Sequence, residues 1–198
     1  MKLISFEGID ASGKKTQAEL LKKYLTEQGY KVELESFPRY ETPIGSLIKK
    51  ALTDEIKITP EALHMLYEVD RVDFTERLEQ LEKLNYDFVI LDRYTHSNIA
   101  FGVAHNISYN WLSLLQSYIR KPDITFLLDI TVEESVRRRN IRQDKFEEDL
   151  DYLDRVRRAY TLLAKNNPSI ILMWMGKSSP EQINEVIIDY LRRKKFIK

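Results

Sequence analysis

The chain has no cysteine among its 198 residues, so it can form neither a disulfide nor a thiolate metal site. It also has no excess of either charge, because 31 Lys and Arg residues balance 31 Asp and Glu residues. The composition therefore provides no overall field that would favour nucleic acid or an acidic membrane surface. We expect neither of these among its partners.

Long apolar runs are lacking too, since no segment approaches the roughly 20 residues needed to cross a bilayer. The sequence contains no internal repeat, low-complexity tract or linker. An apolar run begins at Leu3, which leaves no room for a secretion signal before it. We therefore expect a cytoplasmic protein. A chain of this length is expected to form one domain over residues 1–198 with a real core.

Five short apolar runs alternate with helical patterns along the chain. Most are continuously hydrophobic, which is typical of parallel strands covered on both faces. Pro43 and Pro60 each follow a threonine, as expected for an N-cap and a first helical position. The five runs are residues 3–6, 32–37, 88–91, 124–128 and 170–174. This alternation predicts an α/β fold, a doubly wound sheet of five parallel strands with helices on both faces.

The turn after the first run has the features of a phosphate-binding loop (P-loop). Gly8 and Gly13 are five residues apart in a strand-to-helix turn, and Lys14 follows the second glycine. The glycines let the backbone curl so that its N–H groups surround a polyphosphate, and the next helix adds its positive dipole end. Lys14 is placed to reach the β- and γ-phosphates. A glycine-rich turn without a ligand is the alternative, and the flanking strand and helix weigh against it.

Position 15 departs from the usual motif. A Ser or Thr commonly follows the loop lysine and ligates Mg²⁺, whereas this chain has Lys15. Thr16 does not simply replace it, because one helical step turns a side chain by about 100°. Mg²⁺ commonly keeps several waters and takes one or two protein carboxylates besides substrate phosphates. The departure therefore weakens the motif without abolishing the site.

Residues directly after the apolar runs are informative, because ligands of doubly wound folds bind beyond the carboxyl ends of the strands. Arg39 follows the second run and can clamp an anionic substrate, although an exposed loop arginine explains it equally well. Asp92 and Arg93 follow the third run. Asp92 can orient Arg93 or hold Mg²⁺ through water, and Arg93 can bridge donor and acceptor phosphates. A buried ion pair that supports the loop is the alternative, and we favour function.

Two further features point to a nucleotide. Tyr67 and Arg71 are four residues apart on one predicted helix face, so that both can hold one planar base, although such an aromatic is more often core. A basic cluster after the fourth run lies where phosphates are expected, and we interpret residues 138–148 as an arginine-rich lid over ATP rather than a solvated face. Its members are Arg137, Arg138, Arg139, Arg142 and Lys145. The histidines, His64, His96 and His105, lack metal-ligand spacing.

With these residues in view, the chain resembles the thymidylate kinase family of P-loop nucleoside-monophosphate kinases nearly from end to end. The matching segments are residues 6–17, 37–45, 66–71, 92–101 and 121–123, and residues 144–147 resemble the lid motif. The resemblance implies a P-loop NTPase that transfers the γ-phosphoryl group of ATP to dTMP, giving dTDP and ADP in dTTP biosynthesis. It also implies Mg²⁺ as a cofactor and a homodimer.

The resemblance implies a role for each matching residue. Arg39 and Arg93 would grip the acceptor phosphate, Tyr67 would stack on thymine, and Arg71 would bind its carbonyl. The other acceptor-binding residues would be Asp10, Phe37, Pro38, Ser97, Asn98 and Phe101. The ATP-binding residues would be Gly8, Ala11, Ser12, Gly13, Lys14, Lys15, Thr16, Arg138, Arg142, Gly176 and Lys177. Catalysis would rest on Lys14, Arg93, Arg142 and Asp10, and Mg²⁺ on Asp10, Asp92 and Glu147, partly through water.

Two other functions stay open at this point. A kinase for another nucleotide or for a deoxynucleoside has the same fold. A nucleoside kinase must deprotonate a 5′-hydroxyl, for which Glu7, Asp10 or Asp92 would act as the base. A regulatory nucleotide-binding protein with little catalysis is suggested by Lys15, but the acceptor-site residues weigh against it.

Overall fold

The computed structural model describes residues 1–139, 147–174, 176 and 178–198. Its five strands pair only in parallel, in the order β2-β3-β1-β4-β5, which confirms the predicted sheet. In chain order the elements are β1 (Lys2–Glu7), α1 (Lys14–Glu27), β2 (Val32–Ser36), α2 (Pro43–Leu52), α3 (Pro60–Lys83), β3 (Phe88–Asp92), α4 (Thr95–Ala104), α5 (Tyr109–Leu115), η1 (Gln116–Tyr118), β4 (Ile124–Asp129), α6 (Val132–Arg139), α7 (Glu147–Asn166), β5 (Ile170–Trp174) and α8 (Pro180–Arg193).

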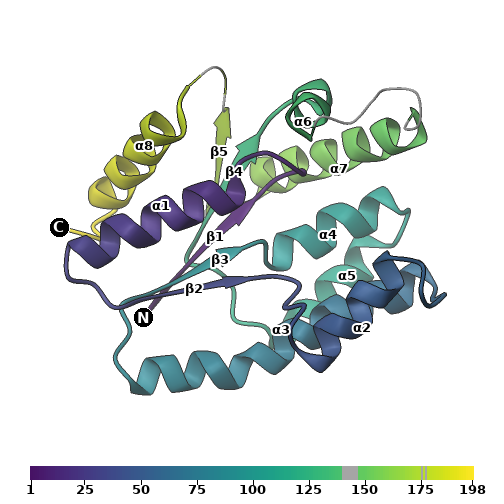
Figure 1. Cartoon of the computed structure of the whole chain (residues 1–198), viewed down its shortest axis with the longest axis horizontal. Coiled ribbons are helices and arrows are strands. Elements are labelled where there is room, and N and C mark those ends of the chain that lie inside the picture. Colours follow the sequence, from purple (N-terminus) through teal and green to yellow (C-terminus); the bar gives the residue numbers. More distant parts are fainter. Residues whose placement is uncertain (140–146, 175, 177) are drawn as a thin grey trace.

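Helices cover both faces of the sheet (Figure 1). Helices α1 and α8 lie against one face, and α3, α4 and α7 lie on the other. Successive side chains of a strand point to opposite faces, and β1 shows the consequence. Ile4 and Phe6 join the cluster that includes Leu21 of α1, whereas Leu3 joins the cluster that includes Phe74 of α3. A strand buried on both faces reads as a continuous apolar run, which is why the sequence located β1, β3 and β4.

The predicted helix starts at Pro43 and Pro60 are confirmed. The hydroxyl of Thr42 accepts the Gly45 N–H at 3.0 Å, and that of Thr59 accepts the Ala62 N–H at 3.3 Å. Each cap satisfies one backbone donor that the helix leaves without a partner. These caps fix where α2 and α3 begin.

The carboxyl ends of β1, β3 and β4 meet at one edge of the sheet, as parallel pairing requires. The chain leaves β1 through Gly8, whose φ of +140° is unfavourable for a residue with a side chain. A Cβ on Gly8 would also lie 2.5 Å from the carbonyl oxygen of Leu128. Glycine is therefore required where the first strand turns into the loop.

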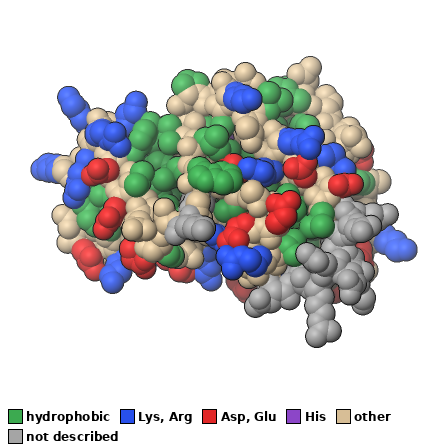
Figure 2. Space-filling view, turned by 90° about the horizontal axis from the view of Figure 1, so that it is seen from above, with side chains coloured by type: hydrophobic (Ala, Val, Ile, Leu, Met, Phe, Trp, Pro, Cys, Tyr) green, Lys and Arg blue, Asp and Glu red, His purple; other side chains and the backbone are tan. Residues whose placement is uncertain are grey.

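Basic and acidic side chains are interspersed on the face shown in Figure 2. Among the residues that the structure describes, no helix combines the length and the apolar character needed to span a membrane.

Candidate active site

A cavity of about 410 Å³ lies at the N-terminus of α1, over the loop that follows β1. Lys14 lines it and is only 7% exposed, with its Nζ donating to the Ile9 carbonyl at 2.8 Å. Burial and the nearby Arg93 lower the pKa of Lys14 from 10.5 to about 7. A polyphosphate would reverse this shift, because an opposite charge stabilises the ammonium form. The complete lining is Ala11, Gly13, Lys14, Lys15, Thr16, Phe37, Asp92 and Arg93.

Lys15 and Thr16 contribute differently to this cavity. The Lys15 side chain is 78% exposed, and its Nζ lies 3.9 Å from the Glu19 carboxylate one helical turn further on. Such a surface pair contributes little to stability. Thr16 is the hydroxyl residue on the cavity wall, but it stands one position after the usual ligand. The departure seen in the sequence therefore persists in the structure.

Asp92 ends β3 and faces the same cavity. Its Oδ1 is buried and has no hydrogen-bond partner among the described residues. Burial raises the pKa of Asp92, although Lys14 and Arg93 oppose the effect. A buried acceptor without a donor costs free energy unless water or a cation satisfies it. Asp92 is thus a fitting ligand for a cation at this cavity.

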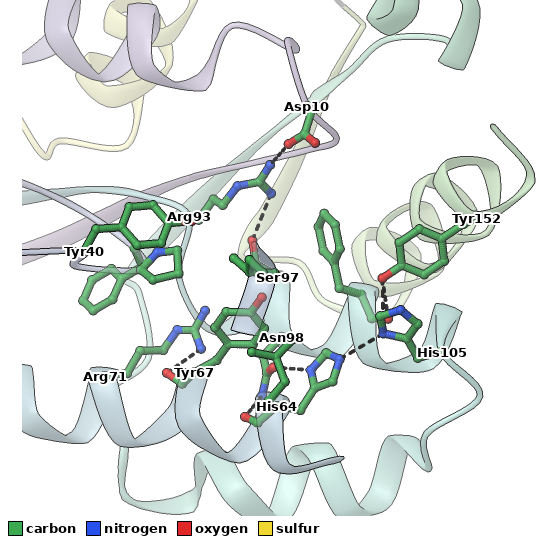
Figure 3. A pocket seen from close by; sticks show the side chains of 15 residues that line it. Asp10, Tyr40, His64, Tyr67, Arg71, Arg93, Ser97, Asn98, His105 and Tyr152 are labelled. Carbon is green, nitrogen blue, oxygen red and sulfur yellow. Dashed lines mark hydrogen bonds and ion pairs between the residues drawn. The ribbon is translucent and has the colours of Figure 1, made fainter. Parts of the chain in front are cut away.

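A second cavity, of about 420 Å³, opens on the other side of Arg93 (Figure 3). Every residue predicted to bind the acceptor lines it, with the exception of Arg39. The complete lining is Asp10, Phe37, Pro38, Tyr40, Leu52, Leu63, His64, Tyr67, Arg71, Arg93, Ser97, Asn98, Phe101, His105 and Tyr152. The walls are mainly aromatic and apolar, with polar groups at a few places, which is the usual character of a small-molecule site.

Arg93 lies where the two cavities meet, because it lines both. Its guanidinium forms an ion pair with Asp10 and donates to the Gly8 carbonyl at 3.0 Å, and it lies 5.2 Å from the ring centre of Phe101. Its backbone has a φ of +63°, held by the bond from its N–H to the Phe6 carbonyl at 2.9 Å. A non-glycine residue in this conformation is strained and often marks a functional site. The guanidinium can therefore reach a phosphate in either cavity.

Tyr67 and Arg71 share a wall of the second cavity, as their spacing on α3 predicts. Arg71 is nearly fully buried, and its Nη1 donates to the Tyr67 carbonyl at 2.9 Å. In Figure 3 both side chains extend from α3 toward the same space. A flat ring and a guanidinium at one wall can hold a planar heterocycle that carries an acceptor oxygen.

Arg39 lines neither of these cavities. Its Nε donates to the Asp70 carboxylate at 2.9 Å, and its Nη2 donates to Asp73 at 2.6 Å. The neighbouring Tyr40 is on the cavity wall instead. No local pattern indicates that α3 brings two carboxylates to Arg39, since Asp70 and Asp73 are more than 30 positions away from it.

Several residues of the second cavity were not anticipated. Besides Tyr40, they include His64, His105 and Tyr152, which meet at one end of the cavity. The rings of His105 and Tyr152 are stacked at 4.5 Å, and His64 Nε2 lies 3.3 Å from His105 Nδ1. The residues come from α3, from the end of α4 and from α7, so no spacing in the sequence links them.

Part of the predicted lid is described. Ser135 of α6 donates to the Asp10 carbonyl at 2.8 Å, and Arg138 donates to the Ala11 carbonyl at 3.2 Å. Helix α6 thus contacts the phosphate loop directly. Arg142, Lys145, Lys177 and the side chain of Glu147 lie outside the described residues. Within the described part of the chain, no group of His, Asp and Glu residues is arranged to hold a metal by itself.

Comparison with known proteins gives a consistent result. The family model for thymidylate kinase matches residues 6–187. A probable thymidylate kinase of Pyrococcus abyssi is 35% identical over 194 residues, which cover 93% of each chain. Another, from Sulfurisphaera tokodaii, is 37% identical over 179 residues and 89% of each chain. The solved structure of thymidylate kinase from Candida albicans matches with a TM-score of 0.82 at 27% identity, covering 98% of this chain and 92% of the other.

Proposed function

The chain belongs to the thymidylate kinase family, and on this basis we propose which substrate each of its two cavities binds. The enzyme is an ATP-dependent nucleoside-monophosphate kinase that phosphorylates dTMP. The loop cavity holds the ATP phosphates, and the second cavity holds dTMP. The family assignment favours neither the regulatory protein nor the nucleoside kinase that the sequence left open.

The position of Arg93 carries this proposal. Because Arg93 lines both cavities, it can bind the acceptor phosphate and also neutralise charge on the group in transfer. Lys14 acts from the ATP side, where the buried ammonium is held by the Ile9 carbonyl until phosphates arrive. Asp10 orients Arg93 through their ion pair. The lid residues Arg138 and Arg142 are proposed to add positive charge around ATP, with Gly176 and Lys177 near adenine.

No general base is needed for this reaction. The second pKa of a phosphate monoester is about 6, so the acceptor is largely a dianion at neutral pH. Glu7, the most deeply buried candidate base, is already engaged by Tyr94, Ser97 and Tyr160. The protein therefore contributes in-line positioning and charge neutralisation.

The base is proposed to lie against Tyr67, with Arg71 donating to a ring carbonyl. Phe101 packs beside Arg93 and would lie under the deoxyribose. Arg39 is held by Asp70 and Asp73, and it would bind the acceptor phosphate only by exchanging these partners. Phe37 and Pro38 close the cavity wall, together with Ser97 and Asn98.

Mg²⁺ fits the loop cavity through Asp92. The buried, unpartnered Oδ1 of Asp92 is an oxygen ligand of the kind that Mg²⁺ prefers, directly or through water. Asp10 lies close by, and Glu147 is a third carboxylate by family resemblance. The ion would neutralise charge on the β- and γ-phosphates. We also propose a cytoplasmic homodimer, which light scattering of the purified protein would test.

The decisive experiment is an acceptor panel with ATP and Mg²⁺. It compares dTMP, dUMP, the ribose form of TMP, and thymidine, with ADP formation as the readout. We expect dTMP to be the best acceptor and thymidine to be inactive. Preference for thymidine would establish a nucleoside kinase instead, and nucleotide binding without turnover would favour the regulatory protein.

A further inference from the structure

Glu68 is a buried carboxylate at the back of the acceptor cavity that does not line the cavity itself. It lies on α3, next to Tyr67, and is only 4% exposed. Its Oε1 accepts the side-chain amide of Asn98, the amide of Gln116 at 3.3 Å and Nη1 of Arg71 at 3.4 Å. One carboxylate oxygen thus joins the two cavity residues that can hydrogen-bond a base, Arg71 and Asn98, to a third element of the fold.

These contacts leave the Asn98 amide a single favourable orientation. Its Nδ2 donates to Glu68 and to the backbone carbonyl of His64 at 3.2 Å. Its Oδ1 faces Nδ1 of His64. Burial lowers the pKa of His64 to about 4, so the ring is neutral at physiological pH, and the tautomer protonated at Nδ1 donates to Oδ1 while the amide is held this way. Turning the amide over would place its oxygen against two acceptors, the Glu68 carboxylate and the His64 carbonyl.

We propose that Glu68 is a positioning residue that makes this cavity selective for pyrimidines with a 4-keto group over pyrimidines with a 4-amino group. The inference rests on the proposed function, since it assigns the base to this cavity. With Asn98 held as described, Oδ1 has a second lone pair and acts only as an acceptor. Arg71 acts only as a donor.

This order of groups matches one kind of base edge. Thymine and uracil present an N3–H donor beside the O4 acceptor, which suits Asn98 Oδ1 and the Arg71 guanidinium. Cytosine presents an N3 acceptor beside a 4-amino donor, which opposes both residues. If the Asn98 amide could turn over, its Nδ2 would satisfy cytosine N3 and the discrimination would weaken. Glu68 acts against that rotation and also holds the Arg71 guanidinium in place.

The test compares dTMP with dCMP as acceptors in four proteins: wild type, Glu68→Leu, Asn98→Ala and the double variant. Steady-state kinetics give kcat and KM, and calorimetry gives binding of each nucleotide without ATP. Glu68→Leu should reduce the dTMP-to-dCMP ratio of kcat/KM by about tenfold or more, mainly through changes in the KM of the two nucleotides. Because Glu68 acts through Asn98, the same substitution should change the ratio little in the Asn98→Ala background.

Glu68→Gln is the matched control. A glutamine keeps an acceptor oxygen for Asn98 and Gln116, and its amide nitrogen takes the place of Oε2, which has no partner in the described structure. The nucleotide preference should therefore stay near the wild-type value although the charge is lost. If Glu68 had only a structural role, Glu68→Leu would lower kcat/KM for dTMP and for dCMP equally and leave their ratio unchanged.

The inference would be overturned if Glu68→Leu left the dTMP-to-dCMP ratio of kcat/KM unchanged. It would also be overturned if the substitution changed this ratio equally in the wild-type and Asn98→Ala backgrounds. Neither outcome would contradict the proposed phosphorylation of dTMP. Failure of the wild type to phosphorylate dTMP would count against the proposed function, and the binding ratios would still test Glu68. If Glu68→Leu does not fold, NMR of the wild type with dTMP decides. The side-chain amide protons of Asn98 should show nuclear Overhauser contacts to the Glu68 γ-protons. If these amide protons instead showed contacts to protons of the base, the inference would be overturned.

Discussion

The carboxylate of Glu7 accepts the backbone N–H of Tyr94 at 2.8 Å, which ties the end of β1 to the start of α4. Glu7 is fully buried and also accepts the hydroxyl of Tyr160 at 2.9 Å and the N–H of Ser97 at 3.3 Å. Strand β1 leads into the phosphate loop, and α4 carries Ser97 and other residues that line the second cavity. One buried carboxylate therefore links the phosphate loop to a wall of that cavity.

Glu7→Gln should lower the free energy of unfolding by about 1–3 kcal/mol, because an amide nitrogen cannot accept the hydroxyl protons of Ser97 and Tyr160 and the remaining bonds are no longer charge-assisted. Urea unfolding measures this change. Glu19→Gln, an exposed substitution on α1, is the matched control and should leave the unfolding free energy within about 0.5 kcal/mol of the wild type. Equal stability of the two variants would mean that the contacts of Glu7 contribute nothing.

Arg93→Ala should reduce kcat by roughly 10³-fold or more, the effect of an arginine that stabilises the transferring phosphoryl group. The reason is its place between the two cavities, where no other described side chain lines both except the apolar Phe37. A coupled assay for ADP measures the loss, and a thermal melt checks the fold. Arg77→Ala, which removes a half-exposed arginine paired with Glu33, should keep wild-type turnover. Normal turnover by Arg93→Ala would refute the mechanism.

The sequence was sufficient for the fold and for the residues that follow the strands. Parallel strands buried on both faces, such as β1, appear as continuous apolar runs, and their carboxyl ends meet at one edge. Gly8, Lys14, Asp92 and Arg93 could therefore be placed together before any contact was known. The pair Tyr67 and Arg71 could be placed on one wall because its spacing is helical.

Long-range contacts between side chains could not be predicted in the same way. Arg39 is paired with Asp70 because α3 packs beside the loop after β2, and no local pattern records that packing. Tyr152 was missed because it reaches the cavity from α7, which carries no motif of its own, and Glu68 was missed because its partners Asn98 and Gln116 are 30 or more positions away. Glu7 was considered only as a base, since its partners at Tyr94 and Ser97 are about 90 residues away.

Tyr67→Ala should raise KM for dTMP by about 10- to 100-fold and leave kcat largely unchanged. Loss of stacking on a base typically costs about 1–3 kcal/mol of binding free energy. The loss is the same in the ground state and in the transition state, so it raises KM rather than lowering kcat. Tyr67→Phe keeps the ring and is the matched control, with a KM within about threefold of the wild type. Initial rates over a range of dTMP concentrations distinguish the two. A similar KM in both variants would place the base elsewhere.

Asp92→Asn should raise the Mg²⁺ concentration needed for half-maximal activity by about tenfold, because an amide oxygen is a weaker ligand than a carboxylate for a hard cation. Activity measured across a Mg²⁺ titration at fixed ATP gives this midpoint. Asp189→Asn replaces an exposed carboxylate on α8 and should leave the midpoint unchanged. If Asp92→Asn shares that midpoint, Asp92 does not hold the ion.

Lys14 should make the stability of the nucleotide-free protein depend on pH. The pKa of Lys14 is about 7 in the folded state against the ordinary 10.5 of an exposed lysine, so the unfolded chain binds more protons between these two pH values. The free energy of unfolding of the wild type should therefore rise, through this group, as pH increases from 7 toward 10.

Lys14→Met removes the buried ammonium and should be more stable than the wild type at pH 7. This difference in the free energy of unfolding should shrink at higher pH. Urea unfolding across this range measures the difference, and the exposed Lys23→Met should follow the wild type. A constant difference between Lys14→Met and the wild type would show that Lys14 keeps its charge on folding.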